Sequence, residues 1–355
     1  MGGVSSTSDG SAARRPITEA DVAERLGVSR ATVSRALHGT GRVSLPTRRR
    51  VLEMADQLGY VPNVMASELA AGRTRTVGLL LRDSYNPVYG LLHARLQSAA
   101  HRVGVEVLTV TATGDVGASR QIAGLRRLLG MRVSGLIVAT GDVPSEQLLP
   151  FREAVPMIRA GRPESDPGIH AVTYDEAHHA RLLVEHVLGH GHREVAVLVP
   201  APEVSLPESV RASCMVRLLL AGGASVSAVS VQRTSDGIAE ALSLAARGEV
   251  TAVMCPTDLR ALEVLRAAQA RGLSVPGDVS VTGCDGVLPG LDLIGLTSVR
   301  LPVEELADRV VGHLVTLMQV TGTGGAAEPV HESLRGVLDA RGSVGAVEDR
   351  GPGRV

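Results

Sequence analysis

The sequence is poor in aromatic residues and has no lysine. Its 355 residues include no tryptophan, one phenylalanine and four tyrosines, and all 36 basic residues are arginine. The core must therefore be packed with valine, leucine and alanine. A binding site in this chain has little aromatic surface on which a sugar ring or a base could stack.

Several motifs are also missing. Cys214, Cys255 and Cys284 lie far apart without a C-x-x-C pair, which argues against a disulfide framework and a zinc site. No run of about 18 apolar residues predicts a membrane span, and the polar arm of residues 1–15 has no signal-peptide core. We therefore expect a cytoplasmic protein without membrane attachment. No G-x-G-x-x-G or G-x-x-x-x-G-K-[ST] follows an apolar run, so a nucleotide-dependent enzyme has little support and no cofactor is expected.

Charge is distributed unevenly along the chain. The formal net charge is −1, but residues 1–75 hold 11 arginines against 7 acidic residues, a balance of +4. The remaining residues therefore carry −5. A basic N-terminal module on a mildly acidic body is typical of a nucleic-acid reader with a separate second domain.

The first sixty residues predict three short helices. Thr18 and Ser29 are suitable N-caps, and a third helix should begin near Ser44-Leu45-Pro46. Gly27 and Gly59 should end the first and the third helix. The expected inward residues are Val22, Ala23, Leu26, Val33, Leu37, Val51, Ala55 and Leu58. Two short helices with a tight glycine turn, followed by a third, form a helix-turn-helix unit.

The second predicted helix has a polar outer face. Arg30, Ala31, Ser34, Arg35 and His38 fall opposite the inward residues. In a helix-turn-helix unit this helix enters the major groove, where Arg35 could pair with guanine and Ala31 could contact a thymine methyl. The same pattern is also compatible with an ordinary solvated amphipathic helix.

From Thr76 onward, short apolar runs alternate with helical patterns. The runs are VGLLL, VEVLTV, GLIVA, EVAVLVP, TAVMCP and VSVTGCD. Strands spaced by helices predict parallel, doubly wound α/β sheets, and this length favours two similar subdomains. Ligands of such folds bind in the cleft at the carboxyl ends of the strands.

The N-terminal segment resembles the DNA-binding headpiece of the lac/gal repressor family. Matching elements follow in order: DVA, GVS, ATVSRAL, VS-x-x-TR-x-RV and LGY-x-PN. The resemblance implies a bacterial transcriptional regulator that binds a palindromic double-stranded DNA operator as a homodimer, since one headpiece reads only a half-site. It implies base contacts by Arg30, Ala31, Ser34 and Arg35. The implied backbone and hinge contacts are Thr18, Ser29, Thr32, His38, Tyr60, Asn63, Ala66 and Leu69.

The family uses residues 62–75 as a hinge helix whose leucine wedges into the minor groove. Leu69 occupies that place in this sequence. An apolar side chain there can lever a base step apart. Ser67 and Glu68 precede it, so the usual arginine is missing and Glu68 should be repelled by phosphate. A plain linker, in which Leu69 only packs, is the alternative.

A more diluted resemblance over the body implies a core of the periplasmic-binding-protein type. Its cleft would take a small effector, often a sugar or nucleobase. The implied effector-binding residues are Tyr85, Asn86, Tyr89, Arg211, Asp258 and Asp285. The alternative for each is an interdomain salt bridge or a cap. Three departures weaken a sugar assignment: Val88 replaces a phenylalanine, Gly161 an aspartate, and Cys284 an aromatic residue.

Two clusters outside this scheme allow a second interpretation. His179, His186 and His190 share a helical face and could suggest a metal, but a solvated face is favoured. Cys255 and Cys284 both end predicted strands at the cleft and could form a thiol sensor, but small buried hydrophobes are favoured.

We expect the following organisation: a disordered arm (1–15), a helix-turn-helix domain (16–61), the hinge (62–75), an effector-binding and dimerisation domain (76–342) and a flexible tail (343–355). The two subdomains should split near 174, with the chain crossing back near 298 and 325. The expected function is an effector-modulated repressor and not an enzyme. The alternatives are a cytoplasmic ligand-binding protein or a regulator controlled by a partner protein.

Overall fold

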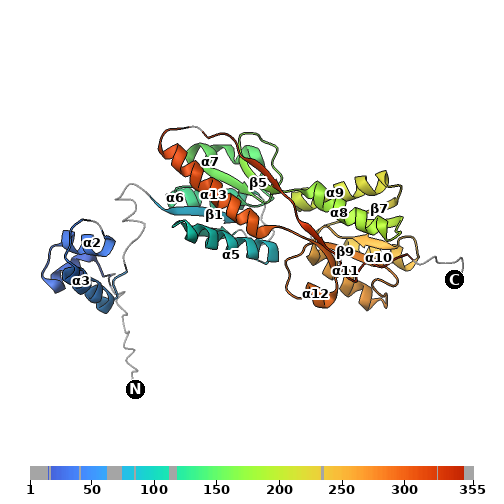
Figure 1. Ribbon diagram of the computed structural model, residues 1–355, viewed down its shortest axis with the longest axis horizontal. Coiled ribbons are helices and arrows are strands. Elements are labelled where there is room, and N and C mark those ends of the chain that lie inside the picture. Colours follow the sequence, from blue (N-terminus) through green and yellow to red (C-terminus); the bar gives the residue numbers. More distant parts are fainter. Residues whose placement is uncertain are drawn as a thin grey trace, which may run out of the picture. The chain divides into compact units, whose positions relative to one another are not determined.

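The computed structural model describes residue 15 and residues 17–39, 41–61, 74–83, 85–111, 118–232, 236–325 and 327–347. The chain divides into two compact units, Met1–Thr74 and Arg75–Val355, which we call the headpiece and the core (Figure 1). The expected hinge positions Asn63, Ala66 and Leu69 lie outside the described residues, as do residues 1–14 and 348–355.

The headpiece has three helices in its described part: α1 (Glu19–Leu26), α2 (Arg30–His38) and α3 (Leu45–Leu58). Thr18, Ser29 and Ser44 cap their first turns, and a left-handed glycine ends each helix. The centre of the unit is formed by Val22, Ala23, Val33, Ala36, Val51 and Ala55. The predicted helix-turn-helix unit is therefore confirmed.

The first half of the core is a lobe built on a six-stranded parallel sheet in the described chain, with the order β11-β5-β4-β3-β1-β2. Its strands are β1 (Thr76–Leu81), β2 (Glu106–Thr111), β3 (Leu136–Ala139), β4 (Met157–Ala160), β5 (His170–Tyr174) and β11 (His331–Leu334). Its helices are α5 (Pro87–Arg102), α6 (Ala118–Gly130), α7 (Leu149–Ala154) and α13 (Val303–Gly322), with a 3-10 turn at Ser145–Gln147. We call this half the N-terminal lobe.

The C-terminal lobe repeats the plan, with the sheet order β12-β10-β9-β8-β6-β7 in the described chain and only the β10–β12 pair antiparallel. Its strands are β6 (Glu194–Pro200), β7 (Ser225–Val231), β8 (Ala252–Met254), β9 (Ser280–Asp285), β10 (Thr297–Arg300) and β12 (Val337–Asp339). Its helices are α8 (Glu176–Gly189), α9 (Leu206–Ala221), α10 (Asp236–Ala246), α11 (Asp258–Ala270) and α12 (Leu291–Ile294).

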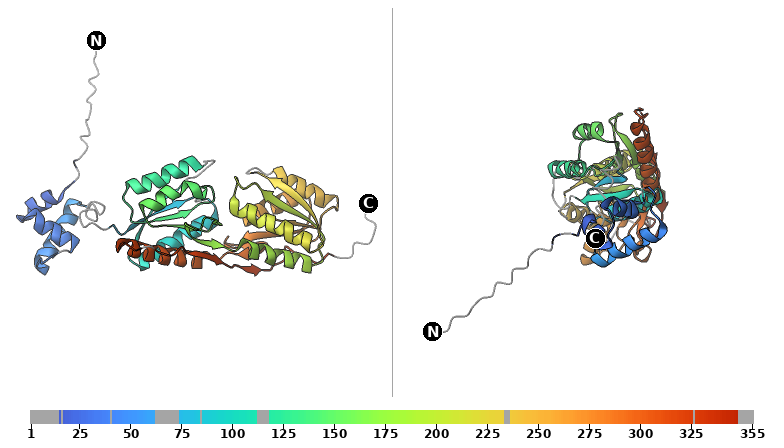
Figure 2. Two further views of the ribbon diagram at one scale, coloured as in Figure 1. Left: turned by 90° about the horizontal axis from the view of Figure 1, so that it is seen from above. Right: turned by 90° about the vertical axis from the view of Figure 1, so that its left-hand side faces the viewer.

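Alternation along the central strands explains why both faces of each sheet are covered by helices (Figure 2). In β1, Val77, Leu79 and Leu81 belong to the cluster under α5 and α13, whereas Leu80 faces the cluster under α6. Because successive side chains point to opposite faces, an all-apolar strand needs cover on both sides. The predicted doubly wound α/β subdomains are therefore confirmed.

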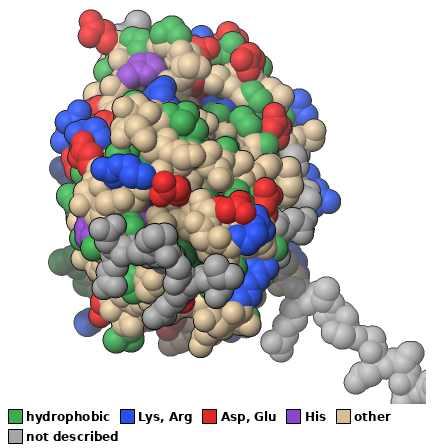
Figure 3. Space-filling model, turned by 90° about the vertical axis from the view of Figure 1, so that its right-hand side faces the viewer, with side chains coloured by type: hydrophobic (Ala, Val, Ile, Leu, Met, Phe, Trp, Pro, Cys, Tyr) green, Lys and Arg blue, Asp and Glu red, His purple; other side chains and the backbone are tan. Residues whose placement is uncertain are grey.

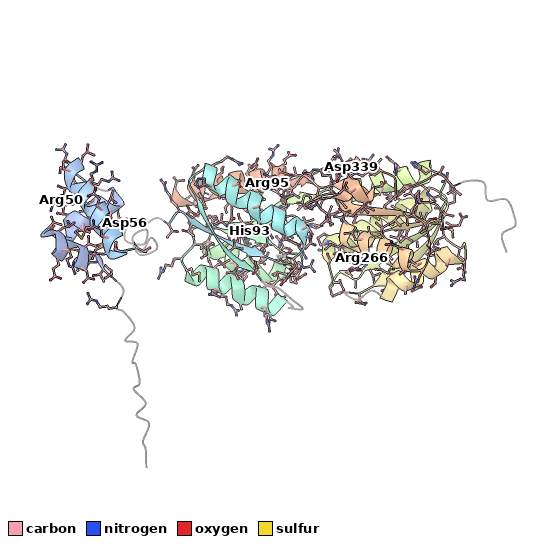
Figure 4. All side chains as sticks on the ribbon, turned by 90° about the horizontal axis from the view of Figure 1, so that it is seen from below. Arg50, Asp56, His93, Arg95, Arg266 and Asp339 are labelled. Carbon is pink, nitrogen blue, oxygen red and sulfur yellow. The ribbon has the colours of Figure 1, made fainter. Side chains whose placement is uncertain are left out.

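Polar contacts also fix α5 in the N-terminal lobe. The His93 ring lies 2.9 Å from the Thr109 hydroxyl of β2, and Arg95 pairs with Glu304 of α13 at 3.5 Å (Figure 4). Helix α5 is thus tied both to the sheet it covers and to the helix that packs beside it.

The described chain passes between the lobes three times. The passages follow β5 at Asp175, β10 at Leu301–Pro302 and β11 at Arg335–Gly336. The third passage was expected near 325 and lies later, because the chain first adds β11 beside β5. At Gly336 the passages meet closely: its N–H donates to His179 Nε2 at 2.8 Å, and a Cβ there would lie 2.4 Å from the Arg300 carbonyl oxygen.

Residues 343–347, expected in the flexible tail, are packed against the C-terminal lobe. Ser343 and Val344 are buried. The Ser343 hydroxyl donates to the Val281 carbonyl at 2.6 Å and accepts from the Thr297 N–H at 2.8 Å. These bonds satisfy backbone groups of the sheet, so residues 343–347 belong to the packed C-terminal lobe. Among the described residues, no helix is long and apolar enough to cross a membrane.

Candidate nucleic-acid interface and ligand cleft

Helix α2 is positioned by local capping. The Ser29 hydroxyl accepts from the Thr32 N–H at 3.1 Å and lies 2.9 Å from the Thr32 hydroxyl. On α1, Thr18 and Asp21 form a reciprocal capping box, and Arg15 pairs with Asp21 at 2.7 Å. The hydrogen bonds from Thr18 hold the pKa of the Asp21 carboxyl below its usual value. Short-range chemistry therefore sets the start of each helix.

The residues predicted to read bases share one accessible face of α2. Arg30, Ala31 and Arg35 are exposed, and Ser34 is partly exposed. The Arg35 Nε donates to the Ala31 carbonyl at 3.1 Å, so this side chain lies along its own helix. The predicted phosphate contacts Thr18 and Ser29 are exposed, while Thr32, His38 and Tyr60 are partly buried.

A residue that the sequence did not single out also lies at this face. Glu19 accepts a hydrogen bond from Arg30 at 3.4 Å, and its other carboxylate oxygen lies 3.2 Å from His38 Nε2. Tyr60 is near both charges: partial burial raises the pKa of its hydroxyl, Glu19 raises it further, and Arg30 opposes the change. These contacts join residues 11 and 19 positions apart, so spacing alone gave no signal for them.

Arginine dominates the charged surface of the headpiece. Its described part holds eight arginines against five acidic residues, and Arg50 projects from α3 into solvent (Figure 4). The end of the C-terminal lobe seen in Figure 3 instead has interspersed acidic and basic side chains. Such a basic module is electrostatically suited to a phosphate backbone.

A cleft lies where the carboxyl ends of the strands of both lobes meet. Its inner compartment, of about 50 Å³, opens into an outer compartment of about 290 Å³. The two compartments share the lining residues Arg82, Asn86, Tyr89, Glu208 and Thr257. This is the place at which doubly wound folds bind ligands.

A buried charge cluster forms the inner wall. The Arg211 Nε donates to Glu176 at 2.7 Å, and its Nη1 lies 3.8 Å from Asp285. Burial disfavours every charge in the cluster, but Arg211 holds the pKa of Glu176 below its usual value. Asp285 responds differently: burial, and then the nearby Asp258, raise its pKa well above the usual value. Its φ of 134° is a conformation that only glycine adopts easily, so strain is concentrated at this wall.

Two buried polar atoms of the inner compartment have no hydrogen-bond partner in the described chain. They are the Tyr174 hydroxyl and Glu176 Oε1. A buried polar atom without a hydrogen-bond partner costs about 1–3 kcal/mol of folding stability. Both residues line the space that a ligand would occupy. A ligand group that donates to Glu176 and bonds to Tyr174 would remove this cost.

Arg82 bridges the two walls of the cleft. Its Nε pairs with Asp142 of the N-terminal lobe at 3.2 Å. Its guanidinium also donates to the Ser205 hydroxyl at 3.4 Å and to the Val204 carbonyl at 2.5 Å, both in the C-terminal lobe. Arg82 therefore connects the two lobes directly.

Four of the six predicted effector residues line the inner compartment. Asn86 and Tyr89 line both compartments, and Arg211 and Asp285 line the inner one. Tyr85 is 86% exposed and lines only the outer compartment. Asn86 also caps α5 by accepting from the Val88 N–H at 3.0 Å.

Asp258 is not among the residues that line either compartment, so the effector role expected for it gains no support from the cleft. It is fully buried and accepts from the Gly286 N–H at 2.7 Å and from the Ser298 hydroxyl at 2.6 Å, so it links the start of α11 to the end of β9 and to β10. Its neighbour Thr257 lines the cleft instead. These contacts favour the alternative role for Asp258, that of a cap.

The two other clusters serve packing and hydrogen bonding, and the solvated face favoured for the histidines is wrong for His179, which is fully buried. His179 accepts from the Gly336 N–H, and the His190 Nδ1 lies 2.8 Å from the His186 carbonyl. Cys255 and Cys284 are fully buried, and burial raises the pKa of both thiols. A raised pKa leaves little reactive thiolate, which argues against a thiol sensor.

Two family models match this chain. Residues 18–63 match the bacterial regulatory proteins of the lacI family, and residues 184–344 match the periplasmic binding protein-like domain. The first range contains the capped helices of the headpiece. The second begins in α8 and includes most of the C-terminal lobe.

Whole-chain relatives agree with these matches. Catabolite control protein A of Priestia megaterium is 31% identical over 82% of this chain and 89% of its own length, and the HTH-type transcriptional regulator Rv3575c of Mycobacterium tuberculosis is 30% identical over 81% and 88%. A Lac repressor dimer bound to operator and the anti-inducer ONPF matches with a TM-score of 0.78 at 25% identity, covering 94% of this chain and all of that one. A complex of the transcriptional regulator CelR with cellobiose matches with a TM-score of 0.63 at 29% identity, covering 93% and 100%. The chain therefore belongs to the lacI family of bacterial regulatory proteins and is a DNA-binding transcriptional regulator.

Proposed function

We propose that this regulator is a repressor that binds a palindromic DNA operator as a homodimer and responds to a small molecule in the cleft of its core. The observation that carries the proposal is the headpiece: a capped helix-turn-helix unit whose α2 leaves Arg30, Ala31 and Arg35 accessible. A single α2 covers only a half-site, so a two-fold operator calls for two copies.

The residue roles are part of the proposal. Arg30, Ala31, Ser34 and Arg35 read base edges in the major groove, because they share one face of α2. Thr18, Ser29 and Thr32 hold phosphates from the starts of the helices, where free N–H groups and hydroxyls gather, and His38 does so with its ring from the last residue of α2. Tyr60 supports this face, and Asn63, Ala66 and Leu69 act in the hinge, with Leu69 as the minor-groove wedge.

The proposed effector is a small polar ligand with hydroxyl or amino groups. Glu176 supplies acceptors and Arg211 supplies donors, while the Tyr174 hydroxyl and the Asp285 carboxyl, whose pKa is raised, can do both. This set suits the hydroxyls of a sugar. Tyr89 and Asn86 close the same space from the N-terminal lobe. The scarcity of aromatic side chains favours recognition by hydrogen bonds over ring stacking.

Regulation requires the effector to favour one arrangement of the lobes over another. The contacts available for this are the Arg82 bridge to Ser205 and the close meeting of the three passages at Gly336. A ligand that strengthens or replaces the Arg82 bridge changes the angle between lobes. That change alters the spacing of the two headpieces in a dimer. The core thus acts by binding, not by catalysis, and the protein works on chromosomal DNA in the cytoplasm.

Selection of binding sites from random duplex DNA by the purified full-length protein tests the proposal. A palindrome whose half-sites are related by two-fold symmetry is the expected result. Absence of enrichment at low salt, where electrostatic binding is strongest, would contradict it. Once a site is known, sugars can be screened for their effect on its dissociation constant. Glu176→Gln serves as the cleft variant, and Glu185→Gln, on the outer face of α8, as its matched control.

A further inference from the structure

Glu19 contacts both ends of the recognition helix. It is the first residue of α1, whereas Arg30 is the first and His38 the last residue of α2. Its Oε2 accepts from Arg30 Nε at 3.4 Å, and its Oε1 lies 3.2 Å from His38 Nε2. One carboxylate therefore links the side chains of the first and the last residue of α2.

The position of this carboxylate is costly for a DNA-binding surface. The Glu19 side chain is only 14% exposed, so its charge has lost much of its hydration. It also places a negative charge beside a face that must approach phosphates. The start of α1 does not depend on Glu19 for capping, because Thr18 and Asp21 complete the capping box. The Glu19 side chain instead makes its contacts with Arg30 and His38 of α2.

The Arg30 guanidinium is held in a way that leaves its end accessible. The Arg30 side chain is 76% exposed, and Glu19 accepts from Nε. A guanidinium has five donors in a fixed plane, so a bond at Nε leaves the two terminal nitrogens for a bidentate pair with the O6 and N7 atoms of guanine. A long side chain that is already oriented loses less entropy when it binds.

We propose that Glu19 is a positioning residue for sequence recognition, which fixes Arg30 of α2 for a bidentate contact with a guanine in each half-site. The inference rests on the proposed operator binding. It adds a specificity determinant from α1, outside the face of α2 to which base reading was assigned. It also has an electrostatic consequence: Glu19 weakens binding to all DNA while it strengthens discrimination between sequences.

The test compares full-length variants by site selection, and by titration of the selected duplex and of a random duplex at one salt concentration. Arg30→Ala should lose roughly ten-fold discrimination at one base pair per half-site. Glu19→Gln should lose part of the discrimination at that same base pair, while its affinity for random duplex rises. The double variant should match Arg30→Ala at this base pair, because Glu19 acts through Arg30.

Two further variants separate charge from position. Glu24→Gln removes one negative charge from the exposed side of the same helix, and should raise random-duplex affinity without changing the preferred sequence. Glu19→Asp keeps the charge but shortens the reach by one methylene. It should lose discrimination at the Arg30 base pair without the rise in random binding, and it serves if Glu19→Gln does not fold.

Three results are distinguishable. If the wild-type protein selects no palindrome, the proposed operator binding fails. If it selects one, and both Glu19 variants keep the wild-type sequence profile, only the positioning role is overturned. If Glu19→Gln shifts the preference at a different base pair, and does so in the Arg30→Ala background as well, Glu19 reads a base itself and the positioning role is again overturned.

Discussion

Removing the charge of Glu164 should destabilise the core strongly. Glu164 and Arg159 form an ion pair with 3.0 Å between Oε2 and Nε, and both side chains are 0% exposed. Burial, together with the charge of Arg162, lowers the pKa of Arg159 to about 10. In the described chain the Arg159 guanidinium also donates to the Val143 carbonyl at 2.9 Å, which is a neutral acceptor. Glu164→Gln would therefore leave a buried cation without its counter-charge.

The expected loss follows from the geometry. At 3.0 Å and an effective dielectric constant of about 20, the attraction that Gln would forfeit is roughly 5 kcal/mol. Breaking one partner of a buried pair costs about 3–5 kcal/mol in proteins, and we expect a loss in this range. Because a domain of this size changes its Tm by roughly 2 °C for each kcal/mol, the core transition should fall by about 6–10 °C.

Urea unfolding of the full chain, followed by circular dichroism, measures this change. Glu146→Gln is the matched control, since Glu146 is exposed near the same arginine, and it should change stability by less than about 0.5 kcal/mol. Arg159→Met combined with Glu164→Gln should regain most of the loss, because no buried charge then remains unpaired. A loss below about 1 kcal/mol for Glu164→Gln alone would refute the reasoning.

Three other variants test separate parts of the account. Ser29→Ala removes the cap of α2 and should cost the headpiece about 1 kcal/mol; an unchanged headpiece Tm would count against the cap. Gly336→Ala places a Cβ 2.4 Å from the Arg300 carbonyl oxygen and should cost the core roughly 1–3 kcal/mol, as measured by urea unfolding; a neutral effect would show that the passages can separate there. Folding lowers the pKa of Glu176, so the unfolded state binds more protons in acid, and this stabilisation is lost as the pH falls below the usual glutamate pKa. Glu176→Gln should therefore show a shallower acid loss of Tm than the wild type, and equal slopes would contradict the stated role of Arg211.

Local chemistry made the headpiece predictable. The caps at Thr18 and Ser29 involve residues three apart, so their spacing is visible in the sequence. The alternation of apolar runs with helical patterns likewise predicted two doubly wound lobes. The strand-end rule, that ligands of such folds bind at the carboxyl ends of the strands, located the cleft, because these ends meet at one edge of a parallel sheet.

Which residues line the cleft depends on the direction of their side chains, and residue spacing does not encode that direction. Asp258 follows a strand at the expected edge but turns toward Gly286 and Ser298 instead of the cleft. Tyr174 ends β5 and Glu176 begins α8, so the strand-end rule could have identified both. The contacts of Glu19 and the packing of Ser343 join residues distant in the chain, and only the tertiary fold reveals them.

Binding of Arg35→Ala to the selected operator and to random duplex tests the central claim most directly. Arg35 is exposed on α2, and its Nε bond to Ala31 lies within the helix, so the substitution should leave the fold intact. We expect a loss of about 1–3 kcal/mol on the operator and relaxed specificity at one base pair per half-site. Wild-type affinity and an unchanged sequence preference would contradict the assignment of α2 as the recognition helix.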